Sequence, residues 1–317
     1  MEFEFNMVNN NIYDLIIIGA GPAGLSASIY ASRYAIKHLI VGTVLGGQIT
    51  ETHKIDNYPG MEDMSGFEFG QLWGKHAKKY GVEIIPSLVQ EIEKENNIFS
   101  LTLADKNILK ARTILLATGT KKRELNILGE KEFLGKGVSY CATCDGFFYK
   151  NKNVGVIGGS DSAVTSALYL ADLAQKVFLI YRKSELRAEP FWVELVKKNN
   201  KIEVIYDTNV IEIMGKEKLE KVKLDKSYNN SDELNLNGLF IEAGSEPSVD
   251  YIENLGVETD EGGYIKIQKN GATNIPGIFS AGDITDGSDK FRQVITAASE
   301  GAISARGIYN WLRKEGK

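Results

Sequence analysis

The sequence is poor in cysteine and histidine, the residues from which disulfide frameworks and zinc sites are built. Two cysteines and three histidines among 317 residues are too few to staple a small secreted fold. A tetrahedral zinc site needs about four nitrogen or sulfur ligands, and none of the histidines stands at ligand spacing from the cysteines. Because few cysteines are typical of a reducing compartment, we expect a cytoplasmic protein. Because the ligands for a zinc site are lacking, we expect no bound metal.

The sequence also lacks a dominant charge and a long apolar run. Its net charge of −5 argues against a nucleic-acid-binding protein, which would carry a basic patch. The nearest approach to a membrane span, Leu15–Ala31, is broken by glycines and a proline, so no membrane association is expected. Met1–Met7 has neither the basic nor the apolar region of a secretory signal. The length predicts about two domains.

What the chain does contain is one pattern of strand, glycine turn, helix and strand that occurs twice. An apolar run predicts a buried parallel strand in each copy, and small apolar residues behind the glycines predict a helix. In the first copy these elements are Asp14–Ile18, Leu25–Ser32 and His38–Val41. In the second copy they are Asn153–Ile157, Ala163–Ala174 and Val177–Ile180. Each copy is the βαβ unit of a dinucleotide-binding fold.

A short β-meander is predicted behind each copy, which points to an internal duplication. The predicted strands are Glu91–Lys94, Phe99–Leu103 and Ala111–Leu116, then Val210–Ile213, Leu219–Leu224 and Gly238–Ile241. A further strand at Gly277–Asp283 is expected to return to the first domain. We therefore predict an α/β protein with two Rossmann-like (ββα-type) domains, the second inserted into the first. The first would span residues 1–120 and 247–317 and the second 121–246, with the crossings at 118–123 and 243–249 serving as hinges.

The first glycine turn is a complete G-x-G-x-x-G fingerprint between a strand and a helix. Its residues are Gly19, Ala20, Gly21, Pro22, Ala23 and Gly24. The glycines allow a tight turn, close approach of a pyrophosphate and close packing of helix on strand. The alternative is a glycine turn that only allows helix and strand to pack closely and binds no nucleotide. No acid follows Val41 to hold ribose hydroxyls, so the fingerprint alone does not choose between FAD and NAD.

The second glycine turn departs from the fingerprint at one position. Its residues are Gly158, Gly159, Ser160, Asp161, Ser162 and Ala163. The side chain of Ser160 could crowd a pyrophosphate or donate a hydrogen bond to it, and a domain that no longer binds nucleotide is the alternative. Arg182, Lys183 and Arg187 stand where an NAD enzyme would place an acid. Cations there favour the 2′-phosphate of NADP(H) over NAD(H), unless they form only a solvated basic patch.

Both cysteines stand in one motif, Cys141-Ala-Thr-Cys144-Asp145. C-x-x-C spacing lowers the pKa of one thiol and closes a small disulfide ring. The alternatives are a zinc site, for which ligands are lacking, and two inert buried thiols. Asp145 could exchange a proton with a leaving thiolate, or it could only cap a helix or turn. A dithiol between two nucleotide folds predicts a relay from a nicotinamide, through a flavin, into a disulfide.

Taken together, these residues resemble the low-molecular-weight, prokaryotic-type thioredoxin reductases over nearly the whole chain. This family forms class II of the FAD-dependent pyridine nucleotide-disulfide oxidoreductases. The motifs that carry the resemblance are Gly19–Gly24, Gly46–Gln48, Asn57–Gly60, Ala117–Gly119, Cys141–Gly146, Arg187–Ala188, Ala281–Asp283 and Arg292–Val294. Two departures concern the nicotinamide nucleotide. Ser160 replaces a glycine that the family usually keeps, and Tyr181-Arg182-Lys183 replaces the family's His-Arg-Arg.

The resemblance implies FAD in the first domain and NADPH in the second. Gly19–Gly24 would hold the FAD pyrophosphate, Asp283 the ribitol, and Arg292, Gln293 and Val294 would approach the flavin ring. The further FAD-binding residues that it implies are Thr43, Gly46, Gly47, Gln48, Asn57, Val89, Ala117, Thr118, Gly119 and Gly282. It also implies a homodimer and a rotation of the NADPH domain between two working states.

The implied activity is thioredoxin-disulfide reduction, with thioredoxin or a glutaredoxin-like protein as partner. Cys144 would lie nearest the flavin, Cys141 would attack the partner, and Asp145 would assist proton transfer. One alternative is a flavoprotein with the same dithiol but an electron donor other than NADPH. The reductase of an alkyl hydroperoxide system carries an extra N-terminal module, whereas about 12 residues precede the first strand here. A ferredoxin–NADP reductase lacks the dithiol, and a flavin-binding redox sensor would show no turnover.

Overall fold

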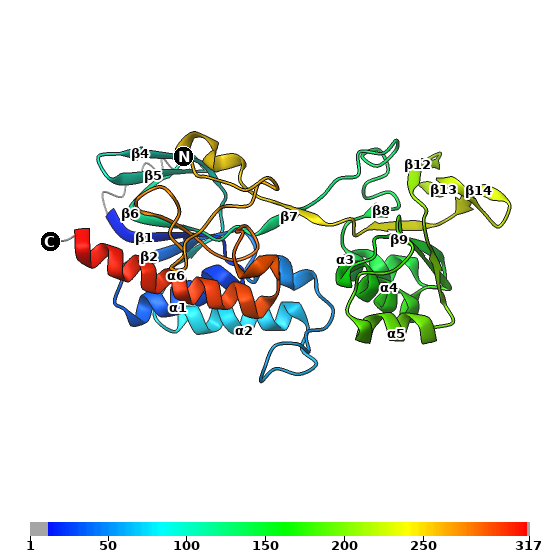
Figure 1. Cartoon of the computed structure of the whole chain (residues 1–317), viewed down its shortest axis with the longest axis horizontal. Helices are drawn as coiled ribbons and strands as arrows, with labels where there is room; N and C mark the ends of the chain where they lie inside the picture. The colour runs from blue at the N-terminus through cyan, green and yellow to red at the C-terminus, as the bar shows by residue number, and fades with distance from the viewer. Residues whose placement is uncertain (1–11, 316–317) are drawn as a thin grey trace, which may run out of the picture. The chain divides into compact units, whose positions relative to one another are not determined.

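The computed structural model describes residues 12–315; the N-terminal stretch inspected for a signal lies outside them. The chain forms two compact units. Unit 1 comprises the chain up to Lys121 and from Glu246 onward, and unit 2 is Lys122–Ser245. Unit 2 is therefore inserted into the chain of unit 1, with boundaries one residue away from those that the sequence predicts. Figure 1 follows the chain through both units by colour.

Unit 1 is built on a seven-stranded sheet with the order β3-β2-β1-β6-β5-β4, and β17 also pairs with β6. Strand β6 pairs in parallel with β1 and β17 and antiparallel with β5. It thereby joins the nucleotide-fold strands and the meander in one sheet. The strands are β1 (Ile12–Ile18), β2 (His38–Val41), β3 (Ile84–Ile85), β4 (Val89–Glu95), β5 (Ile98–Leu103), β6 (Ile108–Leu116) and β17 (Ile278–Ser280).

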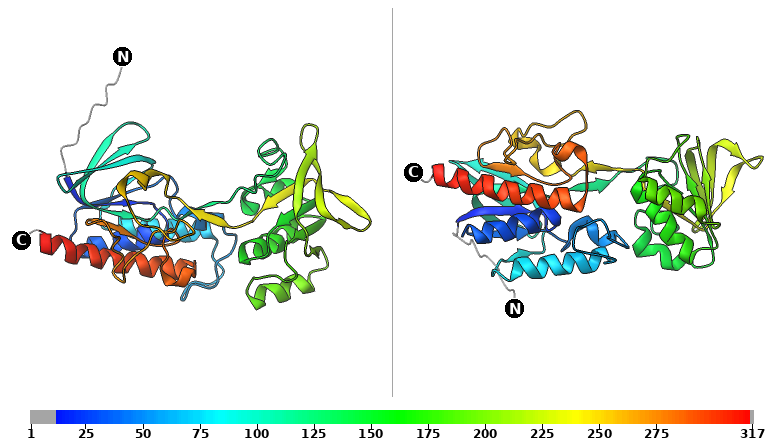
Figure 2. Two further views of the ribbon diagram at one scale, coloured as in Figure 1. Left: turned by 45° about the horizontal axis from the view of Figure 1, so that its top comes forward. Right: turned by 60° about the horizontal axis from the view of Figure 1, so that its bottom comes forward.

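Three helices cover one face of the nucleotide-fold part of this sheet, as Figures 1 and 2 show. They are α1 (Pro22–Arg33), α2 (Gly66–Lys78) and α6 (Val294–Glu315). The backbones of α1 and α6 approach closely, since a Cβ on Gly301 would lie 2.1 Å from the carbonyl oxygen of Ala23. Helix α2 begins with a capping box formed by Ser65 and Glu68. Shorter 3-10 turns are η1 (Gly47–Glu51), η3 (Asp250–Leu255) and η4 (Ser288–Lys290).

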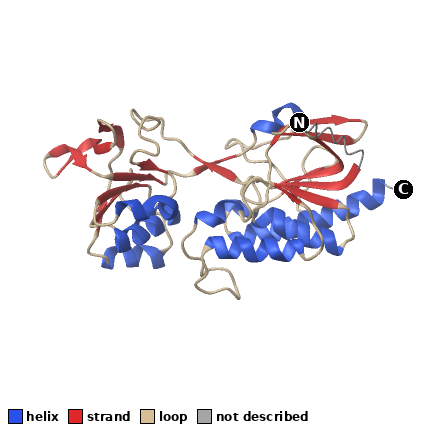
Figure 3. Cartoon of the chain, turned by 180° about the vertical axis from the view of Figure 1, so that it is seen from behind, coloured by secondary structure: helices blue, strands red, loops and turns tan. Residues whose placement is uncertain are grey.

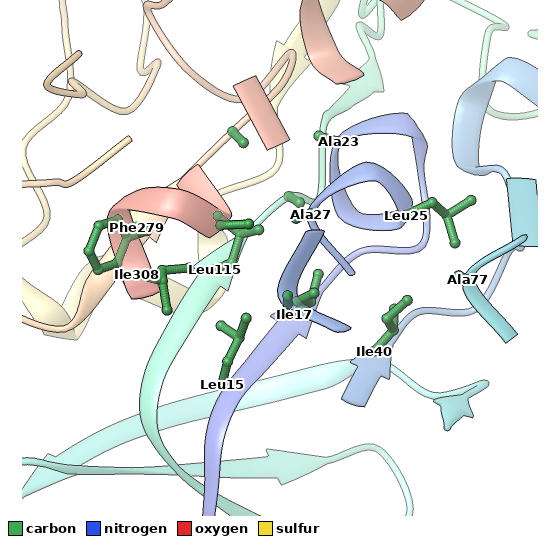
Figure 4. Close-up of a cluster of buried hydrophobic side chains, with 14 of the residues drawn as sticks. Leu15, Ile17, Ala23, Leu25, Ala27, Ile40, Ala77, Leu115, Phe279 and Ile308 are labelled. Carbon is green, nitrogen blue, oxygen red and sulfur yellow. The ribbon is translucent and has the colours of Figure 1, made fainter. Parts of the chain in front are cut away.

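The core between these helices and the sheet is made of small and branched apolar side chains from distant parts of the chain. Figure 4 labels side chains of this cluster from strands β1, β2, β6 and β17 and from helices α1, α2 and α6. They include Leu15, Ile17, Ala23, Leu25, Ala27, Ile40, Ala77, Leu115, Phe279 and Ile308. Because alternate residues of β1 point to opposite faces, Ile16 and Ile18 enter a second apolar cluster with β4, β5 and η3.

Unit 2 contains a five-stranded parallel sheet with the order β11-β10-β9-β15-β8 and a separate antiparallel sheet, β12-β13-β14. The parallel strands are β8 (Val138–Ser139), β9 (Asn153–Ile157), β10 (Lys176–Ile180), β11 (Ile202–Ile205) and β15 (Gly238–Ile241). The antiparallel strands are β12 (Val210–Gly215), β13 (Leu219–Tyr228) and β14 (Ser231–Asn235). The helices are α3 (Ala142–Asp145), η2 (Gly146–Tyr149), α4 (Asp161–Leu173) and α5 (Pro190–Lys198). Figure 3 distinguishes helices from strands.

The predicted α/β class is confirmed, and one prediction about the second meander is wrong. Gly238–Ile241 does not complete the meander, because it pairs in parallel with β9 and β8. The third strand of the meander is β14, which follows a turn at Asn229 and Asn230 with positive φ at both residues. Two successive left-handed residues are typical of a type I′ hairpin turn. Between the units, β7 (Thr120–Lys122) pairs with β16 (Ser245–Pro247). Within residues 12–315 no helix is long and apolar enough to cross a membrane.

Candidate functional site

The first glycine turn leaves space at one of its three glycines. Gly21 is the N-cap of α1 in extended conformation, and a Cβ added to it would meet nothing nearer than 3.9 Å. By contrast, a Cβ on Gly19 would lie 2.1 Å from Ala117 O, and one on Gly24 would lie 1.9 Å from Gly19 O. Gly19 and Gly24 are therefore required by packing. Gly21 is required by neither packing nor backbone conformation, which fits an open cradle for a phosphate group.

Other predicted FAD residues converge on this turn from separate parts of unit 1. Gly46 N donates to Ala20 O at 2.8 Å, and a Cβ on Gly47 would lie 3.0 Å from Gly21 Cα. A Cβ on Gly282 would lie 2.9 Å from the Cβ of Ala23. The loop after β2 and the segment after β17 are thus packed against the turn at the N-terminus of α1.

Several of the remaining predicted FAD residues make side-chain contacts in three smaller groups. The Asn57 side chain donates to Gln293 Oε1 at 3.0 Å, and Thr120 Oγ1 donates to Gln48 at 3.4 Å. The Thr118 hydroxyl lies 2.8 Å from the Tyr251 hydroxyl. Three predicted residues lie apart: Thr43 is exposed behind β2, Val89 packs against the second apolar cluster of the sheet, and Val294 packs near Phe69.

A half-buried acid and a half-buried arginine, Asp283 and Arg292, lie at the end of β17 and before α6. Burial raises the pKa of Asp283 to about 6, although the nearby charge of Arg292 acts in the opposite direction. The Arg292 guanidinium carbon lies 4.0 Å from the centroid of the Tyr264 ring. Arg292 Nε and Nη2 are buried and have no hydrogen-bond partner among the described residues. Unsatisfied buried donors of this kind call for an acceptor, and a flavin offers carbonyl and ring-nitrogen acceptors.

The second glycine turn repeats the geometry of the first. Ser160 is the N-cap of α4 with φ −94° and ψ −179°, close to the values of −81° and −174° at Gly21. Its hydroxyl makes no capping hydrogen bond and is free to donate to a ligand. Arg187 N donates to Gly159 O at 2.7 Å, and the Tyr181 ring occupies the space where a Cβ on Gly159 would lie. The extended backbone at Ser160 therefore accommodates a side chain where the fingerprint has glycine.

The three predicted phosphate-binding cations of unit 2 are exposed beside this turn. Arg182 and Lys183 follow β10, and the backbone hydrogen bond of Arg187 to Gly159 holds the third cation near the turn. In the described part of the chain, none of the three forms an ion pair with an acid. Tyr181 differs from them, since it is only 5% exposed. Its ring therefore supports the turn, whereas its two cationic neighbours are available to a ligand.

The two cysteines form a disulfide at the start of α3. Cys144 is exposed and Cys141 is half-buried. Cys144 N donates to Cys141 Sγ at 3.1 Å, and Cys141 N donates to Ser139 Oγ at 3.0 Å. The hydrogen bond from Cys144 N would stabilise negative charge on Cys141 Sγ after the disulfide is reduced. Within residues 12–315, no three His, Cys, Asp or Glu side chains come together as a metal site requires.

Asp145 lies directly behind the disulfide and is half-buried. It occupies the N-cap position of η2, but its side chain makes no capping hydrogen bond. Burial, and then the charge of Asp145, raise the pKa of Tyr149. The carboxyl group of Asp145 is thus not used as a cap, which favours the proton-transfer hypothesis over the capping alternative.

Two residues beside the disulfide are not among the site residues that the sequence predicts. Phe147 and Phe148 are each 70% exposed, although large apolar side chains are usually covered in a folded protein. The available signal was an aromatic pair immediately behind a redox motif. Two exposed aromatic rings next to a reactive disulfide are suited to contact with a protein partner.

Tyr264 and Glu300 also belong to the site of unit 1 and were not predicted. Glu300 accepts hydrogen bonds from Gly282 N at 2.8 Å, Thr285 Oγ1 at 2.9 Å and Ser288 Oγ at 2.6 Å. It thereby holds the segment that carries Asp283. No local pattern marks either residue, because each acts through contacts distant in sequence.

The chain matches known proteins over nearly its full length. The family model described as pyridine nucleotide-disulphide oxidoreductase matches residues 13–301. The thioredoxin reductase of Helicobacter pylori (strain J99) is 39% identical over 94% of this chain and 98% of its own. That of Listeria innocua is 38% identical over 96% and 95%. The solved structure of Lactococcus lactis thioredoxin reductase has a TM-score of 0.91 at 37% identity, covering 95% of this chain and 99% of that one.

Proposed function

Because the chain belongs to the pyridine nucleotide-disulphide oxidoreductases and, within them, to the low-molecular-weight thioredoxin reductases, we propose that it uses NADPH and FAD to reduce thioredoxin or a glutaredoxin-like protein. Thioredoxin-disulfide reduction, with a flavin and a pyridine nucleotide, is the activity of this family. The Cys141–Cys144 disulfide, whose Cys144 is exposed beside two exposed phenylalanines in the unit with the second glycine turn, is the observation that carries the proposal.

FAD is the flavin proposed for unit 1. The open space at Gly21 and the N-terminus of α1 suit a pyrophosphate. The unsatisfied nitrogens of Arg292 and the buried carboxyl of Asp283 suit the polar groups of the ring and ribityl chain. When bound, FAD supplies the step that links two-electron hydride chemistry to a disulfide. The protein would hold FAD, and the bound FAD would supply hydrogen-bond partners to the side chains of Arg292 and Asp283.

NADPH is the nucleotide proposed for unit 2. The N-terminus of the 13-residue helix α4 and the residues Gly158–Ser162 would hold the pyrophosphate. Arg182, Lys183 and Arg187 would bind the 2′-phosphate, which distinguishes NADPH from NADH. Their exposure and their lack of acidic partners in the described chain support this assignment.

The dithiol would carry the electrons onward to the partner. Two electrons and one proton break the Cys141–Cys144 bond and leave one thiolate and one thiol. The hydrogen bond from Cys144 N to Cys141 Sγ favours the thiolate on Cys141, so Cys141 attacks the partner disulfide and Cys144 resolves the mixed disulfide. Asp145, whose side chain is not used as a cap, would transfer the proton. Phe147 and Phe148 would contact the partner protein. We also propose that two copies of the chain form a homodimer.

Anaerobic titration of the purified protein with NADPH and with NADH, followed by oxidised thioredoxin, tests the proposal. We expect a yellow protein with about one FAD per chain, bleached more readily by NADPH and recovered when thioredoxin disulfide is added. A colourless folded protein that takes up no FAD would contradict the flavin assignment. A flavin that NADPH leaves oxidised, but that another donor reduces with turnover of thioredoxin, would favour the alternative of a different electron donor.

A further inference from the structure

A buried ion pair stands at the carboxyl end of the parallel sheet of unit 2. The side chain of Glu242, which directly follows β15, is 6% exposed. Lys122 Nζ lies 2.9 Å from Glu242 Oε2, and the Ser166 hydroxyl of α4 donates to Glu242 Oε1 at 3.1 Å. Carboxylates are rarely buried without such partners. All three residues lie within unit 2; Lys122 belongs to the crossing at 118–123, and none of the three belongs to a predicted nucleotide-binding motif.

Glu242 lies next to the glycine turn that we assign to the nucleotide. Ile241 pairs with Ile157, the last residue of β9, and Glu242 N donates to Ile157 O at 2.8 Å. A Cβ added to Gly158 would lie only 2.4 Å from Glu242 O. The backbone of Glu242 therefore lies beside Gly158, which opens the turn, and its carboxylate accepts from Ser166 in α4, the helix that follows the turn.

The position is also the topological switch point of the sheet. From β9 the chain proceeds to β10 and β11 on one side, whereas β15 and β8 lie on the other. In open parallel sheets, ligands bind outside the carboxyl ends of the strands where the order reverses. Glu242 and Gly158 flank that point in unit 2.

A negative charge here is unfavourable for an anionic ligand. A pyridine dinucleotide brings a pyrophosphate to the glycine turn, and a buried carboxylate without a cation would repel it, since such charges are weakly screened. We propose that Lys122 is the counter-ion of Glu242 and that this pair sets the affinity of unit 2 for the anionic dinucleotide. The inference rests on the assignment of NADPH to unit 2. Lys122 and Glu242 are positioning residues in this scheme, acting through the local charge at the turn.

The proposal predicts an order of affinities that follows the net charge of the pair. Lys122→Met leaves a charge of −1, Glu242→Gln leaves +1, and the double variant is neutral like the wild type. We expect NADP⁺ to bind the Glu242→Gln variant most tightly, the wild type and the double variant about equally, and the Lys122→Met variant most weakly. Each single step is roughly tenfold, for unit charges acting across about 10 Å at the effective dielectric of a protein surface.

A merely structural role predicts a different pattern. Breaking a buried pair from either side is destabilising, so both single variants would unfold more readily without a charge-ordered change in affinity. Lys122→Arg keeps the charge and should retain wild-type affinity. Lys121→Met is the matched control, because it removes the same charge from the neighbouring residue, which is 48% exposed and belongs to unit 1. It should bind NADP⁺ like the wild type.

The experiment is equilibrium binding of NADP⁺ to the flavin-loaded, full-length protein, with thermal unfolding measured in parallel. NADP⁺ is not turned over under these conditions, so affinity is measured apart from activity. Weakened binding in Lys122→Met that the second change Glu242→Gln restores supports the proposal. Equal affinity of wild type, Lys122→Met and Glu242→Gln overturns it. If Lys122→Met does not fold, looser binding by Glu242→Gln than by the wild type overturns it instead. Failure of the wild type itself to bind NADP⁺ would refute the NADPH assignment, which is a separate outcome.

Discussion

The guanidinium of Arg292 stacks on the ring of Tyr264, with its central carbon 4.0 Å from the ring centroid. This contact holds a cation in place while leaving Nε and Nη2 buried and without partners in the described chain. Burying donors without acceptors costs about 1–3 kcal/mol each. A site that keeps such donors in a fixed orientation is prepared for a ligand that accepts from them.

Replacing Arg292 by alanine should therefore weaken flavin binding. A charge-assisted hydrogen bond contributes about 1.5–3 kcal/mol, which corresponds to roughly a tenfold to hundredfold lower affinity for FAD. The flavin-to-protein absorbance ratio after dialysis, and the dissociation constant on reconstitution, measure this effect. Lys290→Ala is the matched control, since Lys290 also lies over the Tyr264 ring but is paired with Asp260. Equal flavin retention in both variants would show that Arg292 is not a flavin ligand.

Gly21 and Gly24 should respond differently to alanine. A Cβ on Gly21 fits the protein, with no atom nearer than 3.9 Å, whereas a Cβ on Gly24 would lie 1.9 Å from Gly19 O. We expect Gly21→Ala to keep the wild-type unfolding temperature but to bind FAD roughly tenfold or more weakly, because crowding costs about 1–3 kcal/mol. Gly24→Ala should lower the unfolding temperature itself. Normal FAD affinity in a folded Gly21→Ala variant would mean that no phosphate group approaches this residue.

The sequence predicts these local features well because short-range chemistry determines them. Gly21 and Ser160 stand at matching N-caps with nearly the same backbone angles, and the glycine spacing alone places them there. The C-x-x-C motif likewise predicts a disulfide that needs only one helical turn. The wrong assignment of β15 has the opposite origin. The sequence of Gly238–Ile241 predicts a strand, but it does not indicate which strand pairs with it. That neighbour is β9, which is far away in sequence.

The same limit applies to the residues that support the site. Tyr264 meets Arg292 across 28 residues, and Glu300 holds the backbone at Gly282. Lys122 reaches Glu242 across 120 residues. The residues around a lysine or a glutamate in the sequence do not indicate its distant partner, whereas the spacing of a glycine fingerprint indicates the turn that it forms. Supporting contacts therefore emerge only from the folded chain.

The cations of unit 2 should discriminate between the two nicotinamide nucleotides. Arg182→Ala and Arg187→Ala are expected to weaken NADPH by roughly tenfold to a hundredfold, since each loses a charge-assisted contact of about 1.5–3 kcal/mol. NADH lacks the 2′-phosphate, so its affinity should change little. Kd values for both nucleotides measure the difference, with Lys198→Ala in the last turn of α5 as a control for net charge. A wild type that prefers NADH would refute the assignment.

Asp283 should make the stability of the flavin-free protein depend on pH. Burial raises its pKa from 3.8 to about 6, so the folded state holds this proton to a higher pH than the unfolded chain does. Stability from this group is greatest below about pH 4, falls as the pH rises toward 6, and remains lowered above it. This rise in the pKa of Asp283 corresponds to about 3 kcal/mol of stability.

Asp283→Asn does not titrate and should abolish this dependence. The free energy of unfolding in urea, measured at about pH 4 and pH 7, should therefore favour the variant over the wild type more strongly at the higher pH. The control is Asp286→Asn, a nearby acid that binds the backbone of Ile267. The same pH dependence in the wild type and in Asp283→Asn would show that this carboxyl group is not responsible.

Loss of either sulfur should separate the two halves of the reaction. In Cys141→Ser and Cys144→Ser the flavin should still be bleached by NADPH, because hydride transfer precedes the thiols in the proposed order. Reduction of thioredoxin should be abolished in both, since Cys141 has no substitute as attacking thiolate and Cys144 none as resolving thiol. Thr143→Ser, within the same turn, retains both sulfurs and should keep its turnover. Anaerobic flavin absorbance and a thioredoxin reduction assay measure the two halves independently. Thioredoxin reduction by either cysteine variant would remove the disulfide from the electron path, whereas loss of flavin bleaching would place the thiols before the flavin.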